Sequence, residues 1–135
     1  SSVDVGPTGV LPRTPVDPER ELVAWCSAQT SWLKESRAFF RKCLLEGDAN
    51  PELSCTVHEG MARAAAELRA YSNRLRATGL VAPDADPAAA GAMLISVLVG
   101  GTLGEGDLPA MLPRTDNRAM ARYVRVYLTA LGVAR

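Results

Sequence analysis

Apolar residues recur at steps of three and four along most of the chain, which is the spacing of one face of an α-helix. The first helix is expected to start at Asp17 and Pro18, because Asp caps free backbone amides and Pro fits a first turn. It ends at Gly47, with a break in the middle near Ser36. Its apolar positions are Leu22, Trp25, Cys26, Trp32, Leu33, Phe40, Cys43 and Leu44.

Three further helices follow from the same signals. The second begins at Asn50-Pro51, runs for about 28 residues and ends at Gly79, which stands where a left-handed C-cap is wanted. The third follows Asp86-Pro87 and is apolar nearly all round, and residues 100–113, rich in glycine and proline, are expected to form a loop or a frayed helix end. The last begins near Thr115 or Asp116, with the apolar stripe Ala119, Tyr123, Val126, Tyr127, Ala130 and Leu131.

These elements predict an all-α domain. No segment alternates with period two over a useful length, so no strand is expected. Residues 1–16 are dense in glycine and proline and are predicted to form a linker or flexible arm. Residues 17–135 then form one antiparallel helical domain.

The third helix has a row of small residues that share one face, since residues four apart in a helix do so. The row is Ala88, Ala92, Ser96, Gly100 and Gly104. It can serve packing within the chain, or a symmetric contact in which the last two helices of two copies form a four-helix bundle. We expect the homodimer, because a domain of four helices offers too few partners to cover an apolar helix on every side.

Composition removes several function classes. Fifteen basic and fifteen acidic residues cancel, so the chain lacks the basic excess of a nucleic-acid-binding domain. Hydrophobic residues make up 47%, too many for a disordered protein. Three cysteines without a C-x-x-C pair indicate neither a disulfide framework nor a zinc site, and fit a cytoplasmic location. The longest apolar run, 88–103, is shorter than a membrane span, so no membrane partner is expected.

Catalysis has little support in the sequence. A catalytic triad would have to use His58, the single histidine, and nothing near it in the sequence suggests one. The glycine-rich run 100–106 lacks the Lys and Ser/Thr of a phosphate-binding loop and has acidic residues instead. We therefore expect no enzyme activity, no cofactor and no metal.

Two tryptophans on one helix face are the strongest hint of a binding site. Trp25 and Trp32 are seven residues apart, with Gln29 between them. One interpretation is core packing. The other is a pocket with apolar and aromatic walls and a few polar groups.

Two stretches resemble the C-terminal regulatory domain of TetR-type transcriptional repressors. They are 58–68 (HEGMARAAAEL) and 77–90 (ATGLVAPDADPAAA), the second followed by an apolar helix that contains glycine. In that family a long helix commonly ends in such a Gly and Asp-x-Asp-Pro turn, and the next helix and the last one form the dimer bundle. Residues 17–135 are similar in order and length to that domain.

The resemblance implies a repressor whose N-terminal helix-turn-helix domain reads DNA as a dimer. No stretch here looks like that domain, and the chain starts at Ser1 without an initiator Met, so it is expected to be the sensing half alone. DNA would be bound only through the missing half. A small apolar or aromatic effector would enter between the helices and change the spacing of the two DNA-binding domains of the dimer.

Helix faces then give two sets of site residues. The predicted ligand-binding residues are Trp25, Gln29, Trp32, Met61, Leu68, Tyr71 and Met93. The predicted dimer-interface residues are Ala92, Ser96, Gly100, Tyr123, Tyr127 and Leu131. The alternative is a small all-helical scaffold or protein-interaction domain that binds no small molecule.

Overall fold

The fold of the chain is all-helical in the computed structural model, which describes residues 11–46, 48–49, 51–104 and 113–133, apart from the side chains of residues 44 and 53–57. Within these ranges the helices are α1 (Pro18–Glu35), α2 (Arg37–Glu46), α3 (Pro51–Ala77), α4 (Pro87–Leu103) and α5 (Asn117–Leu131). The described residues contain no strand. The predicted fold class is confirmed.

Aspartate side chains cap three of the helices where the sequence predicts it. Asp17 accepts a hydrogen bond from the Arg20 amide, and Asp86 does the same for Ala89. At the start of α5, Asp116 accepts from the Ala119 amide at 2.9 Å. The break predicted near Ser36 is also present, so the first predicted helix is the pair α1 and α2.

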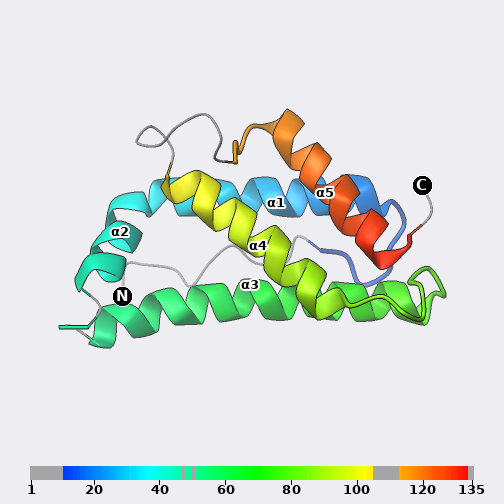
Figure 1. Ribbon diagram of the computed structural model, residues 1–135, viewed down its shortest axis with the longest axis horizontal. Coiled ribbons are helices and arrows are strands. Elements are labelled where there is room, and N and C mark those ends of the chain that lie inside the picture. The colour runs from blue at the N-terminus through cyan, green and yellow to red at the C-terminus, as the bar shows by residue number, and fades with distance from the viewer. Residues whose placement is uncertain (1–10, 47, 50, 105–112, 134–135) are drawn as a thin grey trace.

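Two helices form the two long sides of the molecule, and a third helix crosses diagonally between them (Figure 1). Helix α3 lies along one side of the molecule and α1 along the other, and the two run in opposite directions. Helix α4 crosses between them, antiparallel to α3, and α5 returns beside α1 and α4. Helix α4 is therefore the element that contacts every other helix.

The interior is divided into a main core and a smaller cluster. The main core takes residues from α1, α3, α4 and α5, and its largest fully buried side chains include Trp25, Tyr71 and Leu98. The second cluster, which we call the α2 cluster, consists of buried Leu33, Phe40 and Cys43. Half-buried hydrophobic residues pack against the α2 cluster: Trp32, Phe39, Met61, Val99 and Leu103.

Two predictions about the C-terminal third need correction in part. Of the region predicted as a loop or a frayed helix end, residues 100–103 belong to helix α4, and residues 105–112 lie outside the described residues. The backbone of Gly101 lies against Pro113, since an added Cβ would come 2.8 Å from the Pro113 carbonyl oxygen. In α5, the buried face follows Met120, Val124 and Leu128, whereas Val126 is 65% exposed. Of the six predicted stripe positions, Ala119, Tyr127 and Leu131 are buried, Tyr123 is half-buried, and Val126 and Ala130 are exposed.

Residues 11–16, the described part of the predicted arm, have no regular element but touch the helical domain. Leu11 packs against the main core, and Arg74 on α3 donates a hydrogen bond from Nε to the Pro12 carbonyl at 3.1 Å. This segment therefore lies against the domain.

Two glycines close helices in the left-handed conformation. Gly79, predicted as a C-cap, has φ of 78° after α3, and Gly132 has φ of 74° after α5. Their surroundings differ. Gly79 has open space around it, whereas a Cβ at Gly132 would lie 2.6 Å from the Cβ of Ala82. The Ala82 amide also donates to the Leu131 carbonyl at 2.9 Å, so the end of α5 is held against the α3–α4 turn.

Replacing these glycines separates backbone strain from close packing. Gly79→Ala should lower the free energy of unfolding by about 1 kcal/mol, the cost of a left-handed non-glycine residue. Gly132→Ala should lower it by about 3 kcal/mol, because an overpacked contact with Ala82 is added. Urea unfolding of both variants measures the difference, and equal losses would contradict the close contact between α5 and the α3–α4 turn.

Candidate functional site

Four of the seven predicted ligand-binding residues meet around one cavity between α1, α3 and α4. They are Trp25, Gln29, Trp32 and Met61. The cavity has a volume of about 20 Å³, which is close to the space that one water molecule needs. No charged side chain lines it. The cavity therefore offers apolar walls but little room in the present arrangement.

The remaining three predicted ligand residues lie elsewhere. Leu68 and Tyr71 are buried in the main core. The Tyr71 hydroxyl donates to Glu21 at 2.6 Å, and burial together with this bond raises the pKa of Tyr71 above its ordinary range. Met93 is on the opposite face of α4 and is 68% exposed. These three residues do not contact the cavity.

Six residues of the cavity wall were not predicted. Leu33, Gly60 and Ala64 complete the sides formed by α1 and α3, and α4 contributes Ile95, Leu98 and Val99. The α4 residues share a helix face at spacings of three and four, so the sequence contains their signal. It was hidden because α4 is apolar on every face, and periodicity cannot then show which face meets α1.

The two tryptophans of the cavity have different environments. Trp25 is fully buried, and its Nε1 donates to Glu67 at 2.9 Å. Trp32 is half-buried and packs edge-on against Phe40, with ring centroids 5.0 Å apart. Trp25 therefore belongs to the main core and Trp32 to the α2 cluster, and the cavity lies where the two meet.

Gln29 is the polar exception in this apolar wall. Its side chain is on the inner face of α1 and is 5% exposed. Its Nε2 atom is buried without a hydrogen-bond partner in the protein. A buried amide in this condition costs about 1–3 kcal/mol.

Helix α2 is tied to the end of α4 by one arginine. Arg41 donates to the Leu103 carbonyl from both Nε, at 3.1 Å, and Nη2, at 2.6 Å. Leu103 is in the last turn of α4, where carbonyls lack helical partners and a cation is favourable. This contact holds α2 against the last turn of α4.

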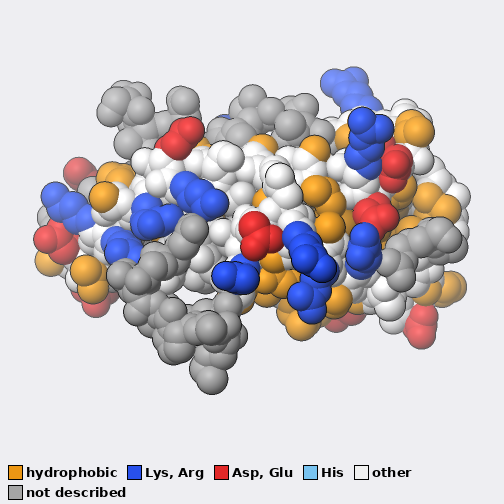
Figure 2. Space-filling view, turned by 90° about the horizontal axis from the view of Figure 1, so that it is seen from above, with side chains coloured by type: hydrophobic (Ala, Val, Ile, Leu, Met, Phe, Trp, Pro, Cys, Tyr) orange, Lys and Arg blue, Asp and Glu red, His pale blue; other side chains and the backbone are white. Residues whose placement is uncertain are grey.

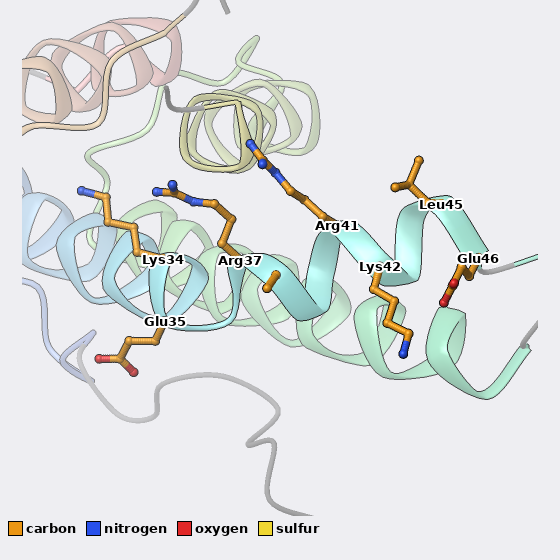
Figure 3. Close-up of a pocket in the computed structure, with 8 residues that line it drawn as sticks. Lys34, Glu35, Arg37, Arg41, Lys42, Leu45 and Glu46 are labelled. Atoms are coloured by element: carbon orange, nitrogen blue, oxygen red, sulfur yellow. The ribbon is translucent and has the colours of Figure 1, made fainter. Parts of the chain in front are cut away.

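A wide groove of about 710 Å³ follows the outer side of α1 and α2 (Figure 3). Four basic residues line it, Lys34, Arg37, Arg41 and Lys42, together with Glu35 and Glu46. Lys34, Arg37 and Arg41 extend toward the same side, and Arg41 points at the end of α4. The groove is a charged surface of mixed sign.

A second, apolar groove of about 150 Å³ runs between α4 and α5. Its walls include the exposed Met93 and Val126 and the half-buried Tyr123. Over α5 the surface mixes hydrophobic side chains with Lys or Arg (Figure 2). On α4 itself the sequence has no charged residue from Pro87 to Leu103. The exposed face of α4 is thus an apolar surface.

The predicted dimer residues fall into two groups. Ala92, Ser96 and Gly100 are exposed on α4, and Tyr123 lines the apolar groove. Tyr127 reaches the groove but is 3% exposed, and burial raises its pKa to about 12. Leu131 is fully buried in the main core. Four of the six residues are therefore accessible to a partner.

Catalytic groups do not gather in the described part of the chain. His58 is exposed on α3, and burial raises the pKa of the Cys26 thiol to about 12, so it stays protonated. No three His, Cys, Asp or Glu side chains of the described residues lie where they could hold a metal ion. Residues 105–112, which include two acidic residues of the glycine-rich stretch, Glu105 and Asp107, lie outside the described residues.

No helix of the described residues is both long enough and apolar enough to cross a membrane.

Comparisons of the chain with protein-family models, with curated proteins and with solved structures found no match.

Proposed function

We propose that this chain is the effector-sensing and dimerisation domain of a TetR-like transcriptional repressor, which releases DNA when a small apolar or aromatic ligand binds. DNA binding is assigned in this proposal to a helix-turn-helix domain outside the 135 residues. One observation supports it above the others: α4 lines the cavity with one face and presents an uncharged, exposed surface with another. A ligand and a second copy would thus act on the same helix.

The cavity supports the sensing half of the proposal. Its wall combines two tryptophans, a methionine and aliphatic side chains with a single buried amide, which is the composition of a small-molecule pocket. Its volume of about 20 Å³ requires that a ligand push the walls apart. The side of the cavity formed by Trp32 and Leu33 packs on the small α2 cluster, so this side is the one that yields most easily.

The α4 surface supports the dimerisation half. Met93 and Val126 project from the two sides of the apolar groove and are 68% and 65% exposed. Because α4 and α5 are antiparallel neighbours, a second copy related by a two-fold axis would complete a four-helix bundle. The chain has no net charge, so two copies have no overall repulsion.

Ligand binding would reach the dimer surface through α4. Ile95, Leu98 and Val99 would be displaced by a molecule that widens the cavity, and Arg41 would transmit movement of α2 to Leu103. Helix shifts of about 1–2 Å at subunit interfaces are a common form of allosteric change. In a dimeric repressor such a shift alters the spacing of the two DNA-binding domains.

A second candidate function is a protein-interaction domain without a small-molecule ligand. The small volume of the cavity favours it, since ligand pockets usually measure about 300–1,000 Å³. In that case the exposed face of α4 would bind a different protein. The two functions differ in whether the cavity takes up a compound.

Charges placed in the apolar groove test the dimer. The double variant Met93→Glu/Val126→Glu should raise the dissociation constant of the dimer at least about a hundredfold, a change of about 2.7 kcal/mol, because carboxylates would be buried without partners. Sedimentation velocity over a concentration series measures this. Leu45→Glu is the matched control, since Leu45 is 86% exposed but lies outside the groove. A wild-type chain that stays monomeric at high concentration would contradict the proposal.

Single-tryptophan variants test the sensing site. With Trp25→Phe, the remaining Trp32 should change its emission in the presence of aromatic hydrocarbons or ketones, because Trp32 lies between the cavity and the α2 cluster. With Trp32→Phe, the response of Trp25 should be smaller, since its ring is fixed by the bond to Glu67. If no compound changes the emission of either variant, the protein-interaction function is favoured instead.

A further inference from the structure

The unpartnered amide of Gln29 indicates what kind of molecule the cavity can select. Among the described residues that line the cavity, Gln29 is the one whose buried side-chain nitrogen lacks a hydrogen-bond partner. The indole N–H of Trp25, which also lines the cavity, is satisfied because it donates to Glu67. An amide nitrogen can only donate, so an atom that satisfies it must be an acceptor.

The rest of the wall restricts the charge of that molecule. No Lys, Arg, Asp or Glu lines the cavity, and the side chains that α3 and α4 contribute to its wall are all apolar. An ion placed there would lose its hydration without a counter-charge, at a cost of several kcal/mol. A neutral molecule avoids this cost.

We infer that the cavity selects a neutral, mainly hydrocarbon ring compound with one oxygen acceptor, which takes the hydrogen bond of Gln29 Nε2. This inference rests on the proposed sensing function and specifies its ligand class. The acceptor oxygen lies on the α1 side of the cavity, and the ring lies between Trp32, Met61 and the apolar face of α4.

The ring needs more space than the cavity now has. A cavity of about 150 Å³ lined by aliphatic and aromatic side chains takes up benzene, whereas this one measures about 20 Å³. Met61 is the side chain most able to move aside and provide the missing volume, because it is half-buried and has three rotatable bonds. Met61→Ala therefore enlarges the site without touching Gln29.

Matched probes test the inference directly. The compounds are 1-indanone, the hydrocarbon indane, which lacks only the carbonyl oxygen, and benzoate as a charged aromatic. Binding to the 135-residue chain and to Met61→Ala is measured by titration calorimetry, and the Gln29 side-chain amide is followed by ¹H–¹⁵N NMR. We expect 1-indanone to bind about tenfold more tightly than indane, the value of one hydrogen bond to an otherwise unsatisfied donor, with a shift of the Gln29 amide signal. Benzoate should not bind.

The second part of the experiment replaces the side-chain amide of Gln29. Gln29→Leu should bring the two affinities to the same value and leave the chain at least as stable, because an unsatisfied buried polar group is removed. Thr30→Val is the control: Thr30 is also buried on α1, but it bonds to the Ser27 carbonyl and does not line the cavity. It should leave the affinity ratio unchanged.

The binding results distinguish a failure of the inferred ligand class from a failure of the proposed sensing function. Equal binding of indane and 1-indanone to the wild-type chain would overturn the role of Gln29 while leaving a ligand site in place. Preferred binding of benzoate would overturn the neutral ligand class. No binding of any probe, even to Met61→Ala, would overturn both this inference and the sensing function.

Discussion

The absence of charge on α4 is the constraint around which the structure is arranged. Seventeen residues of this helix, from Pro87 to Leu103, include no Asp, Glu, Lys or Arg. Such a helix must bury most of its surface. Within the chain it lies against α1, α2, α3 and α5, and what these helices leave open is the face with Ala92, Met93 and Ser96. The proposed dimer is the arrangement that covers this face, and the cavity lies on the opposite, inner side.

Much of the fold could be predicted because its signals are local. A capping aspartate followed by proline marks the start of α1 and α4, and Gly79 marks the end of α3. The α5 stripe was only partly right, because Ala119, Tyr127 and Leu131 are buried as predicted but Val126 is exposed. Val126 and Leu128 are equally apolar, and only tertiary contact decides that Leu128 is buried while Val126 is exposed.

Most of the correctly predicted cavity residues come from one helix, and Met61 on α3 is the exception. Trp25, Gln29 and Trp32 come from a single helix face, so their spacing brought them together in the prediction. To place Leu68 and Met93 correctly, one must know how α3 and α4 are rotated about their axes relative to each other. Helical periodicity in the sequence does not give this rotation. The α4 residues of the wall were missed for the same reason. The sequence pattern shows which residues share a helix face, whereas a cavity depends on which helix faces pack against each other.

The cavity and the proposed dimer surface share helix α4, so thermodynamic linkage between ligand binding and dimerisation tests the proposal directly. If α4 couples them, a ligand that widens the cavity must change the affinity of one copy for another, and coupling of this kind typically amounts to about 5–150-fold. The decisive measurement is the dissociation constant of the dimer by sedimentation, with and without saturating 1-indanone. We expect the dissociation constant to change at least about fivefold. The same constant in both conditions, with the compound demonstrably bound, would contradict it.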